Sequence, residues 1–156
     1  MTQIAAQCLI LACGNTLRSD DGIGPWLAEW AGEKFREDTR VRAIARQQWT
    51  PELAEDLARS ESVLFIDCSV ESAPGSLRLI EVQSSAPARP LATHRIGAPE
   101  LLALAGELYD SQPRHALLLA IGAGSTELGE DFSSPVTASL ANACTLLEET
   151  VTRLLS

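Results

Sequence analysis

Short continuous apolar runs recur along the chain and predict buried β-strands. The clearest runs cover residues 8–12, 63–67 and 115–121, and weaker strand patterns cover residues 41–45 and 77–82. Between them, apolar residues return at helical spacing, which predicts helices over residues 24–35, 51–59 and 99–108. A long final helix begins at Pro135, and its apolar face comprises Val136, Leu140, Ala143, Cys144, Leu147, Val151 and Leu154.

Strands that alternate with helices predict an α/β fold: a three-layer α/β/α sandwich around a mostly parallel, twisted sheet of about five strands. Residues 63–67 and 77–82 are joined by a short loop that contains Pro74 and Gly75. Because a parallel pair needs a long crossover, we expect one of these strands to run antiparallel. Thr50 and Pro51 are predicted to begin the second helix as N-cap and first helical residue. Four apolar residues share one face of the third: Leu101, Leu102, Ala105 and Leu108.

The composition is typical of a single globular domain and argues against some classes of partner. The 156 residues, 46% hydrophobic and 21% charged, suit one globular domain over residues 1–156. The net charge of −9 argues against a nucleic-acid partner, which needs clustered Lys and Arg. The four cysteines form no CxxC pair, and neither an export signal nor a membrane span is recognisable, so we expect reduced thiols and a cytoplasmic location.

Three polar residues are predicted to meet at one edge of the sheet. Asp21 lies in a glycine-rich loop after the first strand, Asp67 ends the strand 63–67, and His94 precedes the helix 99–108. Ligands of open α/β sheets bind outside the carboxyl ends of the strands. Two carboxylates and one imidazole suit a divalent ion such as Zn²⁺ or Ni²⁺ and would leave a coordination position for water or substrate.

Each of these residues also has a purely structural interpretation. Asp20 and Asp21 are typical turn formers and typical negative charges near a helix N-terminus. Asp67 could simply cap a loop, and His94 could be an exposed loop residue. Cys68 should point to the opposite side of the strand from Asp67 and pack as a small apolar residue. His115 begins a strand and is expected to be structural.

Two nucleotide-binding motifs are excluded by the loop sequences. The glycines of the first loop do not follow GxGxxG, and no acidic ribose-binding residue follows the strand 41–45. The chain also lacks GxxxxGK[ST], which excludes a P-loop.

The ordered motifs of the chain resemble those of the hydrogenase maturation endopeptidases. The resemblance covers nearly the whole chain and rests on Gly14-Asn15-x-Leu17-x-x-Asp20-Asp21-Gly22-x-Gly24, Phe65-Ile66-Asp67, Thr93-His94, Glu100-Leu101-Leu102 and Ser133-Ser134-Pro135-Val136. It departs from the family at Ala12, where glycine is common, at Asp21, where many members carry glutamate, and at Ser134, where proline is frequent.

This resemblance implies a small protease that removes a C-terminal extension from the large-subunit precursor of a nickel–iron hydrogenase after nickel insertion. Asp21, Asp67 and His94 would then bind nickel carried by the substrate, for which Zn²⁺ or Cd²⁺ could substitute in vitro. Asp21 and Asp67 are the candidate catalytic residues, and which of them acts as general base stays open.

Two other functions remain open at this stage. One is a non-proteolytic protein that binds metal or a metalloenzyme subunit on the same scaffold. The other is an unrelated small-molecule hydrolase, since one fold hosts many functions.

Overall fold

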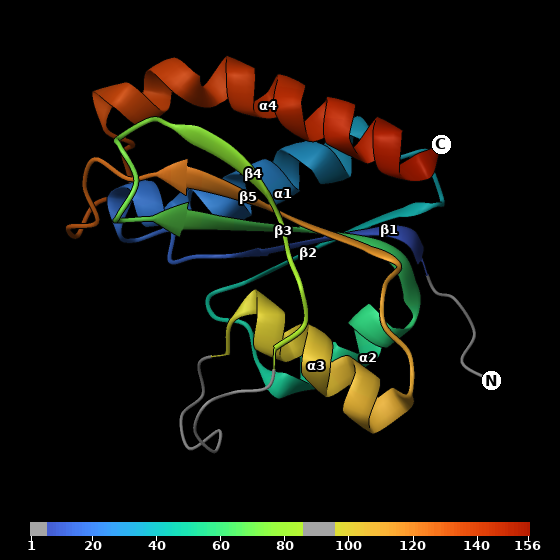
Figure 1. Ribbon diagram of the computed structural model, residues 1–156. Helices are drawn as coiled ribbons and strands as arrows, with labels where there is room; N and C mark the ends of the chain where they lie inside the picture. Colours follow the sequence, from blue (N-terminus) through green and yellow to red (C-terminus); the bar gives the residue numbers. More distant parts are fainter. Residues whose placement is uncertain (1–5, 86–95) are drawn as a thin grey trace.

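The computed structural model describes residues 6–85 and 96–156, and a mixed sheet forms its centre (Figure 1). The strands are β1 (Ala6–Cys13), β2 (Val41–Arg46), β3 (Ser60–Ser69), β4 (Leu77–Glu81) and β5 (His115–Gly122). Their order across the sheet is β2-β1-β3-β5-β4, and only the β4–β5 pair is antiparallel. The predicted sheet of five strands with one reversed strand is therefore confirmed.

Helices cover both faces of the sheet and complete three layers. Helices α1 (Ile23–Lys34) and α4 (Ser134–Leu155) lie on one face, and α2 (Ala54–Ala58) and α3 (Ala98–Tyr109) lie on the other (Figure 1). A hydrophobic core lies on each face of the sheet, and alternate residues of β1 pack into one or the other. Leu9 and Leu11 face α2 and α3, whereas Cys8 and Ile10 face α1 and α4. Burial on both faces explains why the central strands read as continuous apolar runs. No helix among the described residues combines the length and the apolar character of a membrane span.

Three local details differ from the predictions. The second helix begins as a 3-10 turn, η2 (Pro51–Leu53), and the hydroxyl of Thr50 donates to Glu52 Oε1 at 2.7 Å instead of capping the backbone. Leu108, which we expected on the buried face of α3, is 59% exposed because it lies in the last turn, beyond the part of α3 that packs on the sheet. Strand β4 runs antiparallel as predicted but does not pair with β3, since β5 lies between them.

Strands β1 and β3 lie side by side and point the same way, with Ala12 aligned to Ile66. The loops that follow them therefore leave the sheet at the same edge. Helix α1 starts close against this edge: a Cβ on Gly24 would lie 2.5 Å from the carbonyl oxygen of Cys13. Glycine at this position lets the helix follow β1 without a gap.

Candidate functional site

Asp21 lies in the short 3-10 turn η1 (Ser19–Gly22) between β1 and α1. Its Oδ2 accepts a hydrogen bond from the backbone N–H of Asn15 at 2.7 Å, and none of the described residues donates one to its Oδ1. The turn closes tightly because Gly14 has a φ of +152°, and a side chain there would collide with the backbone carbonyl of Asp21. The carboxylate is thus half-buried and oriented by the backbone, with one oxygen left for a ligand.

Asp67 lies near the end of β3, on the face of the sheet that α2 and α3 cover. Its Oδ1 accepts a hydrogen bond from the backbone N–H of Cys68 at 2.8 Å. The side chain lines a small cavity of about 90 Å³ whose other walls are Cys13, Gln47, Gln48, Trp49, Ile96 and Gly97. His94, the third predicted ligand, lies outside the described residues, and this cavity is bordered by the chain that resumes directly after them.

The thiol of Cys68 lies near these carboxylates. Burial raises the pKa of Cys68 to about 12, and the negative charges of Asp21, Asp67 and Asp20 add to that increase. The three carboxylates, from two elements, thus lie close enough to Cys68 to contribute to the raised pKa of its thiol. The protonated thiol packs against the core under α1 and α4, as predicted, and is not a nucleophile.

The described residues contain no group of three His, Cys, Asp or Glu side chains arranged to hold a metal ion. The carboxylates of Asp21 and Asp67 nevertheless have the donor chemistry for a divalent cation, and a backbone amide orients each of them as outer-sphere groups orient metal ligands. The imidazole that the sequence predicts as third ligand, that of His94, lies outside the described residues.

An unsatisfied donor lies beside Asp67. Within residues 6–85 and 96–156, the indole Nε1 of Trp49 is buried and has no hydrogen-bond partner. The indole packs edge-on against Phe65 with ring centroids 5.1 Å apart, and only 5% of the residue is exposed. Buried polar groups are rarely left unpaired, so this donor, on a residue that lines the cavity, calls for an explanation. Nothing in the sequence marks this donor, because a tryptophan in the chain is expected simply to pack in the core.

Asp20, the neighbour of Asp21, has a different role from the one its local context predicts. It is completely buried, and its Oδ2 accepts hydrogen bonds from Gly124 N at 2.7 Å, Ser125 N at 2.9 Å and Ser133 Oγ at 2.7 Å. Its Oδ1 accepts a fourth bond, from Ser133 N, at 2.7 Å. Burial acts to raise the pKa of Asp20, but the hydrogen bonds from Ser133, Ser125 and Gly124 outweigh it, and the pKa lies below its ordinary value. The ionised carboxylate therefore joins the first loop to the loop after β5 and to the start of α4.

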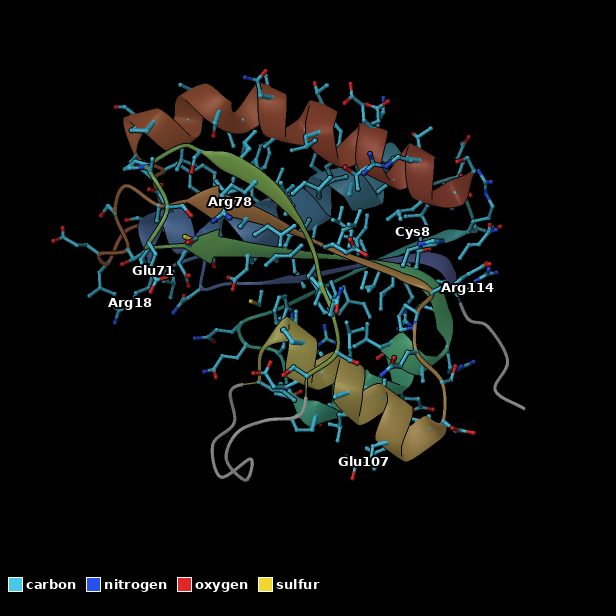
Figure 2. The ribbon with its side chains drawn as sticks, in the orientation of Figure 1. Cys8, Arg18, Glu71, Arg78, Glu107 and Arg114 are labelled. Carbon is cyan, nitrogen blue, oxygen red and sulfur yellow. The ribbon has the colours of Figure 1, made fainter. Side chains whose placement is uncertain are left out.

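The opposite end of the sheet carries a larger cavity of about 620 Å³, bordered by Glu61, Arg114 and His115. Figure 2 shows Arg114 at one end of the sheet and Arg18 and Glu71 at the other. His115 is exposed at the amino end of β5. Because ligands of parallel sheets bind at the carboxyl ends of the strands, we assign the candidate site to the end that holds Asp21 and Asp67.

Comparison with solved structures identifies the fold. The chain superposes on the hydrogenase maturating endopeptidase HybD from E. coli with a TM-score of 0.71 and 18% identity, over 94% of this chain and 93% of that one. The maturation protease HycI from Thermococcus kodakarensis gives a TM-score of 0.68 and 21% identity, with 97% and 94% covered. A hydrogenase 2 maturation peptidase from a Thaumarchaeota archaeon gives 0.66 and 24%, with 93% and 97% covered.

The chain has the fold of the hydrogenase maturation proteases over nearly its whole length, which confirms the fold that the resemblance implies. At the level of sequence, no family model and no curated protein matches it. The structural likeness thus defines the architecture, and the chemistry has to be argued from the residues at the sheet edge.

Proposed function

We propose that this protein is an endopeptidase that removes a C-terminal extension from the large-subunit precursor of a nickel–iron hydrogenase after nickel insertion. The observation that carries the proposal is the pair of oriented carboxylates, Asp21 and Asp67, at the shared carboxyl edge of β1 and β3. The fold common to this chain and the hydrogenase maturation proteases supports it. The proposed setting is the cytoplasm, where thiols stay reduced, and none of the four cysteines forms a disulfide.

In this proposal the nickel ion arrives as part of the substrate. Asp21, Asp67 and His94 bind it and thereby place the scissile peptide bond at the edge of the sheet. A divalent ion at that position can polarise a carbonyl group or lower the pKa of a water molecule. One of the two carboxylates then accepts the proton of the attacking water. An empty precursor offers no ion to bind, so it is not aligned and is not cut.

The cavity beside Asp67 gives the substrate chain a further contact. The unpaired Nε1–H of Trp49 is suited to donate to a carbonyl oxygen of the bound peptide, a bond that would satisfy it. With a volume of about 90 Å³, the cavity admits only a small group. Peptide backbone or a small side chain next to the cleavage site fits this description.

Cleavage of a nickel-loaded precursor, followed by mass spectrometry, tests the proposal. Wild-type protein should release the extension, and Asp67→Asn should abolish release while circular dichroism shows an unchanged fold. His94→Ala should behave like Asp67→Asn, and His115→Ala, at the opposite end of the sheet, provides the matched control with full activity.

Two outcomes would contradict the proposal. Full activity of Asp67→Asn would exclude a ligand or catalytic role for this carboxylate. Binding of the precursor by the wild type without any loss of mass, in the presence of nickel, would instead show a binding protein on the protease fold.

A further inference from the structure

A cleft of about 150 Å³ opens on the surface between α1 and the loop after β5. Its walls include Pro25, Trp26 and Glu29 of α1 and Glu130 and Phe132 of the loop. The indole of Trp26 meets the ring of Phe132 edge-on, with centroids 6.2 Å apart. Because an apolar cavity of roughly 150 Å³ can hold benzene, this cleft has room for one branched aliphatic or aromatic side chain.

Exposed apolar side chains also lie on the two loops that border the cleft. Leu17 is 57% exposed, Leu128 is 77% exposed and Trp26 is 37% exposed. Leu17 and Leu128 occupy neighbouring positions, since each directly precedes one residue of the isolated bridge between Arg18 and Gly129. Apolar groups gathered in this way on a surface, in contrast to scattered ones, typically mark a binding site.

The backbone beneath this surface is held firmly. Ser19 N donates to Gly129 O at 2.7 Å, and Gly129 N donates to Leu17 O at 2.9 Å. The hydroxyl of Ser19 adds a bond to Glu127 O at 2.8 Å, and the buried carboxylate of Asp20 ties the same two loops together. A surface that is already ordered loses little entropy when a partner binds.

The charge around the cleft is negative. Glu29, Glu127, Glu130 and Asp131 are all exposed, and in the described part of the chain none of them forms an ion pair. Arg18 is the nearby cation on the first loop. Glu29 and Glu130 in the wall of the cleft, with Glu127 and Asp131 on the same loop as Glu130, complement a partner that combines an apolar side chain with positive charges. A second copy of this chain, with its net charge of −9, would be repelled.

We propose that this surface, made of the cleft and the exposed Leu17 and Leu128, binds a partner segment in which a branched or aromatic side chain is flanked by lysine or arginine. The inference rests on the proposed function only for the identity of the partner, which is then the hydrogenase precursor. The segment binds beside the first loop, so it lies next to the edge of the sheet that holds Asp21. This surface therefore serves as a docking site for the substrate, separate from the residues that contact nickel.

The experiment is an NMR titration with a defined probe, acetyl-Gly-Lys-Leu-Lys-Gly-amide. The indole ¹⁵N–¹H signal of Trp26, assigned with Trp26→Phe, should shift with a millimolar Kd, and the signal of Trp49 in the other cavity should not. Replacing the leucine of the peptide with serine, or both lysines with glutamate, should remove the shift. The double variant Glu29→Lys/Glu130→Lys should weaken binding about fivefold or more, and added salt should weaken it in the wild type.

A matched control changes the net charge equally but leaves the surface intact. Glu107→Lys/Glu149→Lys places the same charges on exposed positions of α3 and α4, and binding should stay within about twofold of the wild type. Figure 2 shows Glu107 at the far side of the molecule, below the sheet.

Each outcome supports or overturns the inference. No shift of Trp26, or an equal shift with the glutamate peptide, overturns it, and so does a shift of Trp26 that depends on protein concentration alone, because self-association then covers the surface. A peptide-dependent shift without any cleavage of precursor would leave the docking surface in place and refute the protease. Cleavage with an unchanged KM in Glu29→Lys/Glu130→Lys would refute the docking surface and leave the protease in place.

Discussion

Replacing Asp20 with asparagine changes one buried atom from an acceptor to a donor and keeps the shape of the side chain. In the better orientation, the amide oxygen takes the place of Oδ2 and still accepts from Gly124, Ser125 and Ser133. The amide NH₂ then faces the backbone N–H of Ser133, which loses its acceptor. If the amide turns the other way, the bond from Ser133 N survives, but the backbone N–H groups of Gly124 and Ser125 then face the NH₂ group. At least one hydrogen bond of the cluster is therefore broken in either orientation.

The expected loss of stability follows from these contacts. A hydrogen bond to a charged group contributes about 1.5–3 kcal/mol, and an unsatisfied buried donor costs about 1–3 kcal/mol. The three surviving bonds weaken because the acceptor is neutral, while burial of a neutral side chain offsets part of the loss. We expect the free energy of unfolding to fall by about 2–4 kcal/mol for Asp20→Asn and by about 3–5 kcal/mol for Asp20→Ala, which leaves all four donors without a partner.

Urea unfolding followed by circular dichroism measures the free energy of unfolding of each variant and of the wild type. The thermal midpoint of Asp20→Asn should fall by roughly 5–15 °C. The matched control is Asp21→Asn, the same substitution one residue further on. Asp21 is half-buried and accepts one hydrogen bond, which an asparagine oxygen can still accept, so we expect a change below about 1 kcal/mol. If Asp20→Asn were no less stable than Asp21→Asn, the hydrogen bonds of Asp20 would not hold the two loops together.

Three further predictions concern the core and the cavity. Burial raises the pKa of Cys8 from 9.0 to about 12, so the unfolded chain loses this proton first and stability falls as pH rises above 9.0. From this residue alone the free energy of unfolding should fall by about 1.4 kcal/mol by pH 10, and urea unfolding of Cys8→Ala should lack that part of the pH dependence. Gly24→Ala should destabilise the protein by about 1–3 kcal/mol because its Cβ would press on Cys13, whereas Gly32→Ala on the same helix, with no atom within 4 Å, should stabilise it by about 0.5–1 kcal/mol; equal signs in thermal unfolding would contradict this. Trp49→Phe should lower kcat/KM for the precursor, and the corresponding activation free energy should change more than the free energy of unfolding does. Unchanged kinetics would show that the indole N–H makes no substrate contact.

The local pattern of apolar and polar residues was sufficient to predict most of the helices and strands. The apolar runs of β1 and β3 located both central strands, and each acidic residue at their ends could be placed at the carboxyl edge because parallel strands end on the same side. The ends of elements were less predictable: η2 replaced the first turn of a helix, and Leu108 fell on the exposed end of α3. Propensity and periodicity describe a segment by itself, whereas its ends depend on what packs against it.

The sequence by itself determined the layers, the reversed strand and the position of Asp21 and Asp67, because periodicity and chain direction are local properties. Only the tertiary structure decided that β5 lies between β3 and β4 and that Asp20 bonds to residues 104 to 113 positions away. The two adjacent aspartates look alike in the sequence, yet one is buried among hydrogen-bond donors and the other is half-exposed at the carboxyl edge of the sheet. What separates their roles is which distant groups reach each carboxylate, and folding alone brings those groups together.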